Sequence, residues 1–322
     1  MWTFIARRLL AIPPLLLAVT FLTFCLLYAA PGDYFTRLME DPQITEEYLA
    51  ALREKHGLEG GLFYRYWRWL LNAIQFDFGY SFKFDLPVFD LIGERLANTL
   101  LLTGTALVIA WGLALPLGVM AGVYQGRLID KAASFISFVG LSIPRVFFAL
   151  LMVMFAATTG WFPVSGMRDQ IYWDDMSTGE QILDVLHHLC LPAFVIGTTS
   201  MAGYMRQMRA EMVETLSKDY VRTARAKGLS PRQVVYKHAF GNAINPLITL
   251  FGYSLAALLT GAFLVEVVFA WPGLARLTVD AVFSQDEPLV MAAVLVATLM
   301  LVMGNTIADL LLAFVDPRIR LE

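Results

Sequence analysis

The sequence contains few charged residues. Asp, Glu, Lys and Arg make up 16% of its 322 residues, whereas about a quarter is usual in soluble domains. Hydrophobic residues make up 58%, and the mean hydropathy is +0.62. This composition excludes an ordinary soluble domain and indicates an integral membrane protein. The length is enough for about six membrane-spanning helices and their loops, because each span needs ~20 residues.

Several sequence motifs of catalysis and metal binding are missing. The two cysteines, Cys25 and Cys190, lie in apolar stretches and have no metal or redox spacing. There is no Gly-x-x-x-x-Gly-Lys-Ser/Thr phosphate loop, so this chain is not expected to hydrolyse ATP itself. There is no His-Glu-x-x-His or Gly-x-Ser-x-Gly motif, and His187-His188 are interpreted as outer-surface residues. These absences predict a chain that is not an enzyme and carries no metal or cofactor.

Six apolar stretches are candidates for membrane spans. They are Leu9–Ala29, Ala97–Tyr124, Ala132–Ala157, Leu189–Tyr204, Ala243–Phe269 and Leu289–Phe314. The fourth is short, whereas the others exceed the ~18 apolar residues that predict a membrane helix. Most contain proline, which membrane helices tolerate because neighbouring groups satisfy the freed backbone carbonyls. The sequence therefore predicts an all-α integral membrane protein with six transmembrane helices.

Lysine and arginine are unevenly distributed between the two sides of this arrangement. With the N-terminus inside, fourteen lie in inner segments: Arg7, Arg8, Arg127, Lys131, Arg206, Arg209, Lys218, Arg222, Arg225, Lys227, Arg232, Lys237, Arg318 and Arg320. The short outer segments carry two, Arg168 and Arg276. Positive charge favours the cytoplasmic side, so we expect both termini to be cytoplasmic.

The spans divide the chain into three parts. Residues 1–30 hold the N-terminus and the first transmembrane helix, 31–96 form an extracytoplasmic insertion, and 97–322 form a core of five transmembrane helices. Within the insertion, Gln43–Gly57 has the composition of a helix, with acidic residues early and basic residues late. Phe63–Leu71 is aromatic and basic, which suits an interfacial helix.

The inner loop 205–242 carries the clearest local signal. Glu211–Lys227 has the composition of a helix. Gly228 suits the end of that helix, Ser230 suits an N-cap, and Pro231 suits the first residue of a second helix. The loop therefore predicts a helix, a sharp turn and another helix. A basic loop that only binds anionic lipid is the alternative.

Segments along nearly the whole chain occur in an order typical of one family. They are Asp219–Ser230, His238, Asn242, Pro246, Val265–Leu274, Asp309 and Asp316–Arg320, with Arg65–Trp69, Asp77–Ser81, Glu94–Leu100 and Leu141–Pro144 upstream. In these segments the chain resembles the permeases of the dipeptide and oligopeptide importer family, within the ATP-binding-cassette transporters. The wider superfamily has Glu-Ala-Ala where this chain has Arg222-Thr223-Ala224, which follows the peptide branch.

The resemblance implies a type I importer permease architecture and specific partners. These are a second homologous permease, two cytoplasmic ATPase subunits that bind ATP and Mg, an extracytoplasmic solute-binding protein and membrane lipid, with no nucleic acid. It also implies that the inner loop is a coupling helix that binds in a groove of an ATPase. The residues assigned to coupling are Asp219, Tyr220, Thr223, Ala224, Arg225, Ala226, Lys227, Gly228, Leu229 and Ser230. The implied location is the inner membrane of a bacterium or archaeon.

Polar residues inside the apolar stretches are further candidates, because a charge at mid-membrane costs at least ~2.5 kcal/mol. Arg145, beside Pro144, is assigned to the solute path, where it attracts a carboxylate, or it pairs with an acidic neighbour such as Glu266. Glu266 is likewise assigned to the path, with a structural hydrogen bond as the alternative. Asn305 and Asp309 lie four residues apart and predict a polar clamp between helices. The segment Trp271-Pro272-Gly273 is assigned to an outer gate or to an interfacial anchor.

The function expected from the resemblance is uptake of dipeptides, oligopeptides or similar solutes by alternating access. Permeases for nickel complexes, glutathione or antimicrobial peptides belong to the same family and remain alternatives. An ion-coupled secondary transporter would need an ion site and matching broken helices in its two halves. A membrane anchor or scaffold would not need the inner helix–turn–helix.

Overall fold

The computed structural model describes residues 2–36 and 45–315. These residues form helices and one isolated antiparallel bridge between Tyr80 and Pro87, and no β-strand occurs among them. The chain divides into two compact units. Unit 1 comprises Met1–Thr99 and Pro272–Val302, and unit 2 comprises Leu100–Trp271 and Met303–Glu322. The all-helical prediction is confirmed for the described part of the chain.

Unit 1 holds the predicted insertion. Its helices are α1 (Trp2–Ala29), α2 (Glu46–Lys55), α3 (Leu62–Ile74), α13 (Leu274–Ser284) and the first parts of α4 (Val88–Val123) and α14 (Glu287–Val315). The helix predicted over Gln43–Gly57 is present as α2, although residues 43 and 44 lie outside the described part. The Thr45 hydroxyl accepts from the Tyr48 N–H at 3.3 Å and so caps α2. The sequence did not indicate α13.

The aromatic segment of the insertion forms α3, as predicted. Tyr66 is its buried anchor: its ring lies 5.1 Å from that of Phe21 on α1, and its hydroxyl lies 3.0 Å from the Thr20 hydroxyl. Phe63 and Trp67 are exposed, with 76% and 60% of their surfaces accessible. Exposed aromatic rings beside a buried anchor fit a helix at the membrane surface, and that location stays a prediction.

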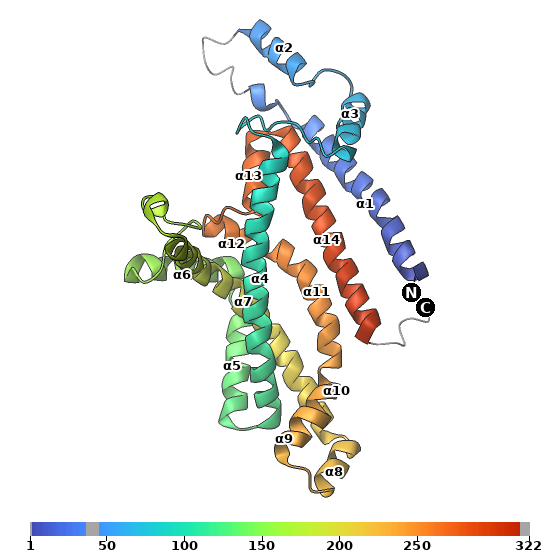
Figure 1. Ribbon diagram of the computed structural model, residues 1–322, viewed down its shortest axis with the longest axis vertical. Helices are drawn as coiled ribbons and strands as arrows, with labels where there is room; N and C mark the ends of the chain where they lie inside the picture. Colours follow the sequence, from blue (N-terminus) through green and yellow to red (C-terminus); the bar gives the residue numbers. More distant parts are fainter. Residues whose placement is uncertain (1, 37–44, 316–322) are drawn as a thin grey trace. The chain divides into compact units, whose positions relative to one another are not determined.

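Unit 2 is built on one long helix. That helix is α7 (Thr178–Ser217). Besides it and the ends of α4 and α14, the unit contains α5 (Leu128–Ser142), α6 (Arg145–Thr159), a 3-10 turn (Trp173–Asp175), α8 (Asp219–Ala226), α9 (Pro231–Gln233), a π-helix (Val234–Phe240), α10 (Gly241–Ala243), α11 (Asn245–Gly261) and α12 (Phe263–Val268). Figure 1 shows α8 and α9 beyond one end of α7. The core contains Leu102, Leu189 and Ile196, all fully buried.

The fourth apolar stretch is not a short span. It lies inside α7, whose 40 residues extend for about 60 Å. Ser177 starts this helix early, because its N–H and hydroxyl both donate to Glu180, at 2.8 and 2.7 Å. A helix of this length exceeds the ~30 Å hydrocarbon core of a bilayer.

The third apolar stretch is broken, which corrects the prediction of one continuous span. α5 and α6 meet at an angle of 101°. Pro144 has no N–H and disfavours helical backbone at the residue before it, and Ile143 is extended, with φ −83° and ψ 120°. Arg145 is therefore the first residue of α6 rather than a residue in the middle of a helix.

The number of spans agrees in part with the prediction. Four helices among the described residues are long and apolar enough to cross a membrane, and the bent α5–α6 pair makes up to five. The four lie in α1, α4, α7 and α14. The fifth predicted stretch is divided into the 17-residue α11 and the short α12, so neither piece alone has the ~20 residues of a span.

Glycines bring α4 against α7. An ideal Cβ added to Gly118 would lie 2.6 Å from the Met208 Cβ, and one added to Gly122 would lie 2.5 Å from the Met212 Cβ. Both methionines are fully buried. Small residues permit this close approach of helix backbones, which is the usual way in which membrane helices gain packing.

Candidate functional site

The inner loop begins at a break that the sequence analysis did not predict. One helix was expected over Glu211–Lys227, but Lys218 is extended, with φ −71° and ψ 149°, so α7 ends and α8 begins there. The Ser217 hydroxyl donates to the Glu214 carbonyl at 2.7 Å and closes the last turn of α7. The break gives α8 a direction of its own.

The turn after α8 has the predicted geometry. Gly228 has φ +79°, which glycine adopts without the steric cost of a Cβ. Its N–H donates to the Arg225 carbonyl at 3.0 Å. Ser230 and Gln233 then form a reciprocal cap, in which the Ser230 N–H donates to Gln233 Oε1 at 3.1 Å, and Pro231 is the first residue of α9. The predicted helix–turn–helix is therefore confirmed.

A small apolar core holds this unit together. Val221 and Ala224 of α8 and Val234 of the π-helix are buried against one another, with Leu216 and Leu229 packed beside them. Ala224 is therefore part of the base of the loop, with 6% of its surface exposed, and it is not placed to contact a partner directly. Its small side chain lets α8 approach the π-helix.

The opposite side of the loop is exposed and carries the basic residues Arg225 and Lys227. Its exposed members among the assigned residues are Asp219, Tyr220, Thr223, Arg225, Ala226, Lys227, Gly228 and Ser230. Arg222, which the sequence assignment omitted, forms a 3.4 Å ion pair with Asp219. Ala226 and Gly228 leave room for close backbone approach between the basic side chains. We call this face the coupling surface.

Tyr236, which the sequence assignment missed, is an exposed aromatic residue in the second half of the inner loop. It is 65% exposed and belongs to the π-helix Val234–Phe240. π-helical turns are rare and occur frequently at functional sites. No sequence pattern indicated a π-helix, because residues 234–240 are compatible with an ordinary helix after Pro231.

A polar and aromatic cluster in unit 2 contains residues of α4, α7 and α11. The rings of Trp111 and Tyr204 stack with centroids 4.5 Å apart, and the Trp111 indole donates to the Ser254 hydroxyl at 3.1 Å. Tyr204 also hydrogen bonds with Ser254 and interacts electrostatically with Arg145. The cluster joins α4, α7 and α11 to the first residue of α6. Only Arg145 of this group was a sequence candidate.

The other proposed pathway residue, Glu266, is fully buried in α12. α12 packs against α6, with Val265 and Ala149 in one core cluster. Trp271 is also fully buried, and its backbone N–H donates to the Glu266 backbone carbonyl at 2.9 Å. The expectation of Trp271 as an interfacial anchor is therefore wrong, because an anchor keeps its ring at the membrane–water boundary.

Pro272 and Gly273 belong to unit 1, where they lead into α13. The Asn98 side-chain amide donates to the Pro272 carbonyl at 2.9 Å, and the Thr99 hydroxyl accepts from the Leu274 N–H at 2.8 Å. These bonds fix the start of α13 to α4. The role of this segment as an outer gate stays a prediction.

The remaining candidates lie on α14, near the C-terminus and in the histidine pair. Asn305 and Asp309 lie on α14, and Asp309 is 9% exposed; their clamp stays a prediction. The segment Asp316–Arg320 lies outside the described residues. Within residues 2–36 and 45–315, no group of three or more His, Cys, Asp or Glu side chains is arranged to hold a metal ion. His188 instead lies 3.2 Å from Asp184.

A buried ion pair joins α5 to α7. Arg209 of α7 pairs with both carboxylate oxygens of Asp130 on α5, one of them at 2.9 Å. Asp130 also accepts from the Gly126 N–H at 2.8 Å. Asp130 is 4% exposed, and a buried carboxylate persists only when it is paired in this way. Sequence reasoning had counted Arg209 only as one of the inner positive charges.

Comparison with known proteins identifies the family. Residues 114–321 match the model of the binding-protein-dependent transport system inner membrane component, and residues 1–103 match the model of its N-terminal part. The chain is 42% identical to the oligopeptide transport system permease protein AppB of Bacillus subtilis. It is 36% identical to the di/tripeptide transport system permease protein DppB of Pseudomonas aeruginosa and 35% identical to the glutathione transport system permease protein GsiC of Escherichia coli. Each match covers 99% of both chains.

Among solved structures, an inward-facing MetNI methionine ABC transporter matches with a TM-score of 0.49 and 19% identity, covering 69% of this chain and 96% of that chain. The match to the family model spans well over half of the chain, and the curated relatives are all named as transport system permease proteins. The chain belongs to the binding-protein-dependent transport system inner membrane components, the permease subunits of ATP-binding-cassette importers.

Proposed function

We propose that this permease imports dipeptides or oligopeptides across the inner membrane by alternating access. The observation that carries the proposal is the end-to-end similarity to permeases that are named for oligopeptides and for di- and tripeptides. Glutathione, the solute named for another relative, is itself a small peptide. A path for peptides must accept a terminal carboxylate, which is the group that these solutes share.

The coupling surface is proposed to bind a cytoplasmic ATPase. Its support is the combination of a rigid base and an exposed face: Val221, Ala224 and Val234 are buried, whereas Ala226 and Gly228 are exposed. A unit with its own core moves as one body when a partner displaces it. The exposed cations, among them Arg225, would attract an acidic groove on the partner.

The proposed assembly contains a second homologous permease, two ATPase subunits and an extracytoplasmic solute-binding protein. ATP and Mg would be bound by the ATPases, since the chain has no phosphate loop. Six spans with cytoplasmic termini, in a type I importer architecture with an outer insertion at 31–96 and a core at 97–322, agree with the charge distribution. In that arrangement the broken α5–α6 pair and the α11–α12 region each account for one span.

Arg145 is proposed to attract the carboxylate of the solute. It starts α6 at the break after Pro144 and lies near Tyr204 in the polar and aromatic cluster. A guanidinium can bind a carboxylate through two parallel hydrogen bonds, and Tyr204, with which Arg145 interacts electrostatically, stacks on Trp111. Glu266, buried in the neighbouring α12, would then interact with the positive end of the solute or with the helix frame.

The test compares two identical substitutions in reconstituted membranes. This chain is co-reconstituted with its neighbouring permease, ATPases and binding protein, and peptide-stimulated ATP hydrolysis is measured. Ala226→Lys places a long side chain on the coupling surface, whereas Ala210→Lys places it on an exposed position of α7 outside that surface. We expect Ala226→Lys to lower stimulated hydrolysis by about tenfold or more, because a clash at a packed interface costs at least ~1.4 kcal/mol.

Ala210→Lys should leave stimulation close to the native value. Equal stimulation in the two variants would contradict the proposed ATPase contact. A second matched pair is Gly228→Ala, in the turn after α8, and Gly126→Ala, in the turn between α4 and α5. Both substitutions strain the backbone in the same way, because the two glycines have φ +79° and +76°. Only the first should lower stimulation. Failure of peptides to stimulate even the native complex would overturn the choice of solute.

A further inference from the structure

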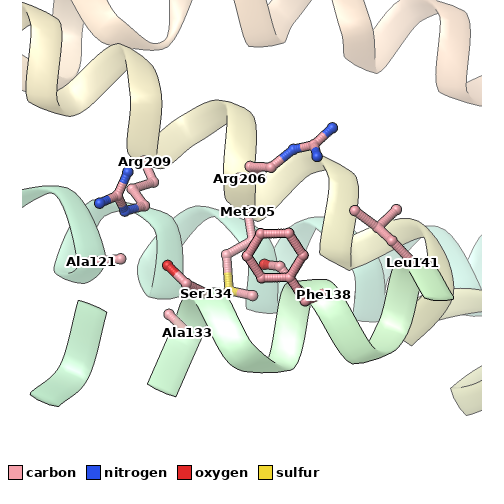
Figure 2. A pocket seen from close by; sticks show the side chains of 9 residues that line it. Ala121, Ala133, Ser134, Phe138, Leu141, Met205, Arg206 and Arg209 are labelled. Carbon is pink, nitrogen blue, oxygen red and sulfur yellow. The ribbon is translucent and has the colours of Figure 1, made fainter. Parts of the chain in front are cut away.

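A pocket of about 180 Å³ lies between α5 and α7 of unit 2. We call it the α5–α7 pocket. It is lined by Ala121, Ala133, Ser134, Ser137, Phe138, Leu141, Met205, Arg206 and Arg209. Figure 2 shows Ser134, Phe138 and Leu141 along α5, facing the α7 side chains Met205, Arg206 and Arg209, with the two guanidinium groups well apart. The pocket thus has hydroxyl, apolar and cationic walls.

The two arginines of the pocket differ in their charge balance. Arg209 is neutralised by Asp130, which it contacts through both carboxylate oxygens. Arg206 is exposed, and it has no hydrogen bond or ion pair with any residue in the described part of the chain. The α5–α7 pocket therefore presents one uncompensated positive charge, with a capacity for up to five hydrogen bonds.

The pocket lies at the depth where lipid headgroups are expected. Arg206 follows the apolar stretch Leu189–Tyr204 by two residues, on the side that the lysine and arginine distribution predicts to be cytoplasmic. α5 starts at the α4–α5 turn on that same side, so Ser134 lies nearer the inner surface than Leu141. Ser134 therefore lies towards the headgroup layer and Phe138 and Leu141 lie towards the acyl chains. Arg206 starts at the level of Phe138 (Figure 2), and its long side chain can extend towards the headgroup layer, as arginines near the ends of membrane helices do.

We propose that the α5–α7 pocket binds the phosphate headgroup of an anionic phospholipid from the inner leaflet. Arg206 donates to the phosphate oxygens, and the Ser134 and Ser137 hydroxyls lie on the wall beside the headgroup. Phe138 and Leu141 contact the start of an acyl chain. Basic pockets between membrane helices on the cytoplasmic side bind lipid headgroups in this way. The volume is smaller than the ~300 Å³ or more of pockets that enclose a whole ligand, which suits a headgroup whose chains lie outside.

The experiment measures lipid binding to the full-length chain directly. The purified chain is titrated with dioleoylphosphatidylglycerol, and the apparent Kd of the most tightly bound lipid is obtained by native mass spectrometry. Arg206→Gln should weaken this binding by about tenfold or more, because a charge-assisted hydrogen bond is lost. Arg206→Lys, which keeps the charge but not the planar fork, should give an intermediate Kd. The matched control is Arg127→Gln, an exposed inner arginine outside the pocket, which should stay within about twofold of the native Kd.

Three results would overturn the proposal. The first is equal binding in the native chain, Arg206→Gln and Arg127→Gln, which would show that inner positive charge acts without a specific site. The second is displacement of the lipid by a dipeptide, which would assign the pocket to the solute path. The third is equally effective displacement by inorganic phosphate, which would mean that the acyl chain contributes nothing. The assay needs neither transport nor ATP, so its outcome is independent of the proposed function.

Discussion

The close contact between α4 and α7 predicts that one added methyl group on α4 will destabilise the chain. In Gly122→Ala the new Cβ would lie 2.5 Å from the Met212 Cβ and 3.2 Å from the Arg209 carbonyl oxygen. These atoms belong to the α7 backbone or are attached to it directly, so rotation of a flexible side-chain end does not relieve the clash. The two helices must move apart, or α7 must shift along α4.

The magnitude follows from comparison with a neutral position of the same helix. Adding a methyl group to a well-packed interior typically costs about 1–3 kcal/mol. Replacing glycine by alanine inside a helix also gains about 0.5–1 kcal/mol through backbone entropy. Gly112→Ala has that gain alone, because no atom lies within 4 Å of its added Cβ. The free energies of unfolding of the two variants should therefore differ by about 1–3 kcal/mol, with Gly122→Ala less stable.

The assay is reversible unfolding of the full-length chain in detergent, followed by circular dichroism, with the two variants measured side by side. Gly118→Ala provides a replicate, because its Cβ would lie 2.6 Å from the Met208 Cβ and 2.8 Å from the Met205 carbonyl oxygen. Equal stability of Gly122→Ala, Gly118→Ala and Gly112→Ala would refute the close approach of α4 and α7.

Three further predictions concern ionised groups. Arg209→Met leaves the buried Asp130 carboxylate without its cation and should lower the free energy of unfolding by about 3–5 kcal/mol; Asp130→Asn in the same chain should restore part of it in the same unfolding assay. Arg145→Gln should lower uptake of a dipeptide by about tenfold in proteoliposomes and leave uptake of its C-terminal amide unchanged; equal loss for both solutes would exclude a carboxylate contact. Burial raises the pKa of Asp33, but hydrogen bonds from Arg53 and Thr36 outweigh it, so the pKa is lowered overall. The resulting stabilisation is complete above the usual Asp pKa of about 3.9 and is lost as the pH falls below it; hydrogen exchange in α2 should accelerate there in the native chain, and Arg53→Gln should abolish this pH dependence.

The inner loop shows what local sequence chemistry can predict. Gly228, Ser230 and Pro231 determine a turn and a cap through their own backbone preferences, and the structure has both. Lys218 has no such preference, so the division between α7 and α8 was not predictable from its identity. Ala224 was assigned to the contact face because it is small, but small residues also suit close internal packing, and here the apolar neighbours bury it.

The broken helices show where sequence reasoning ends. Pro144 and Pro192 both lie in apolar stretches, yet the chain bends by 101° after α5, whereas α7 continues through Pro192. Membrane helices tolerate proline when their surroundings satisfy the freed carbonyls, so the outcome depends on tertiary packing. The burial of Trp271 is similar: the residue type favours an interface, but its position after α12 places it in the core. Tyr204 and Ser254 came together from distant segments, which one sequence does not reveal.

The continuity of α7 has a mechanical consequence. Over its length of about 60 Å, a tilt of about 5° displaces one end by about 5 Å while the other end stays in place. Gly118 and Gly122 hold α4 against the part of α7 that precedes α8, and Gly197 of α7 lies against Ile109 and Ala106 of α4 near the middle of α7. A push on α8 would therefore move α7 together with the helix packed along it, so that a tilt starting at the inner loop reaches the far end of α7.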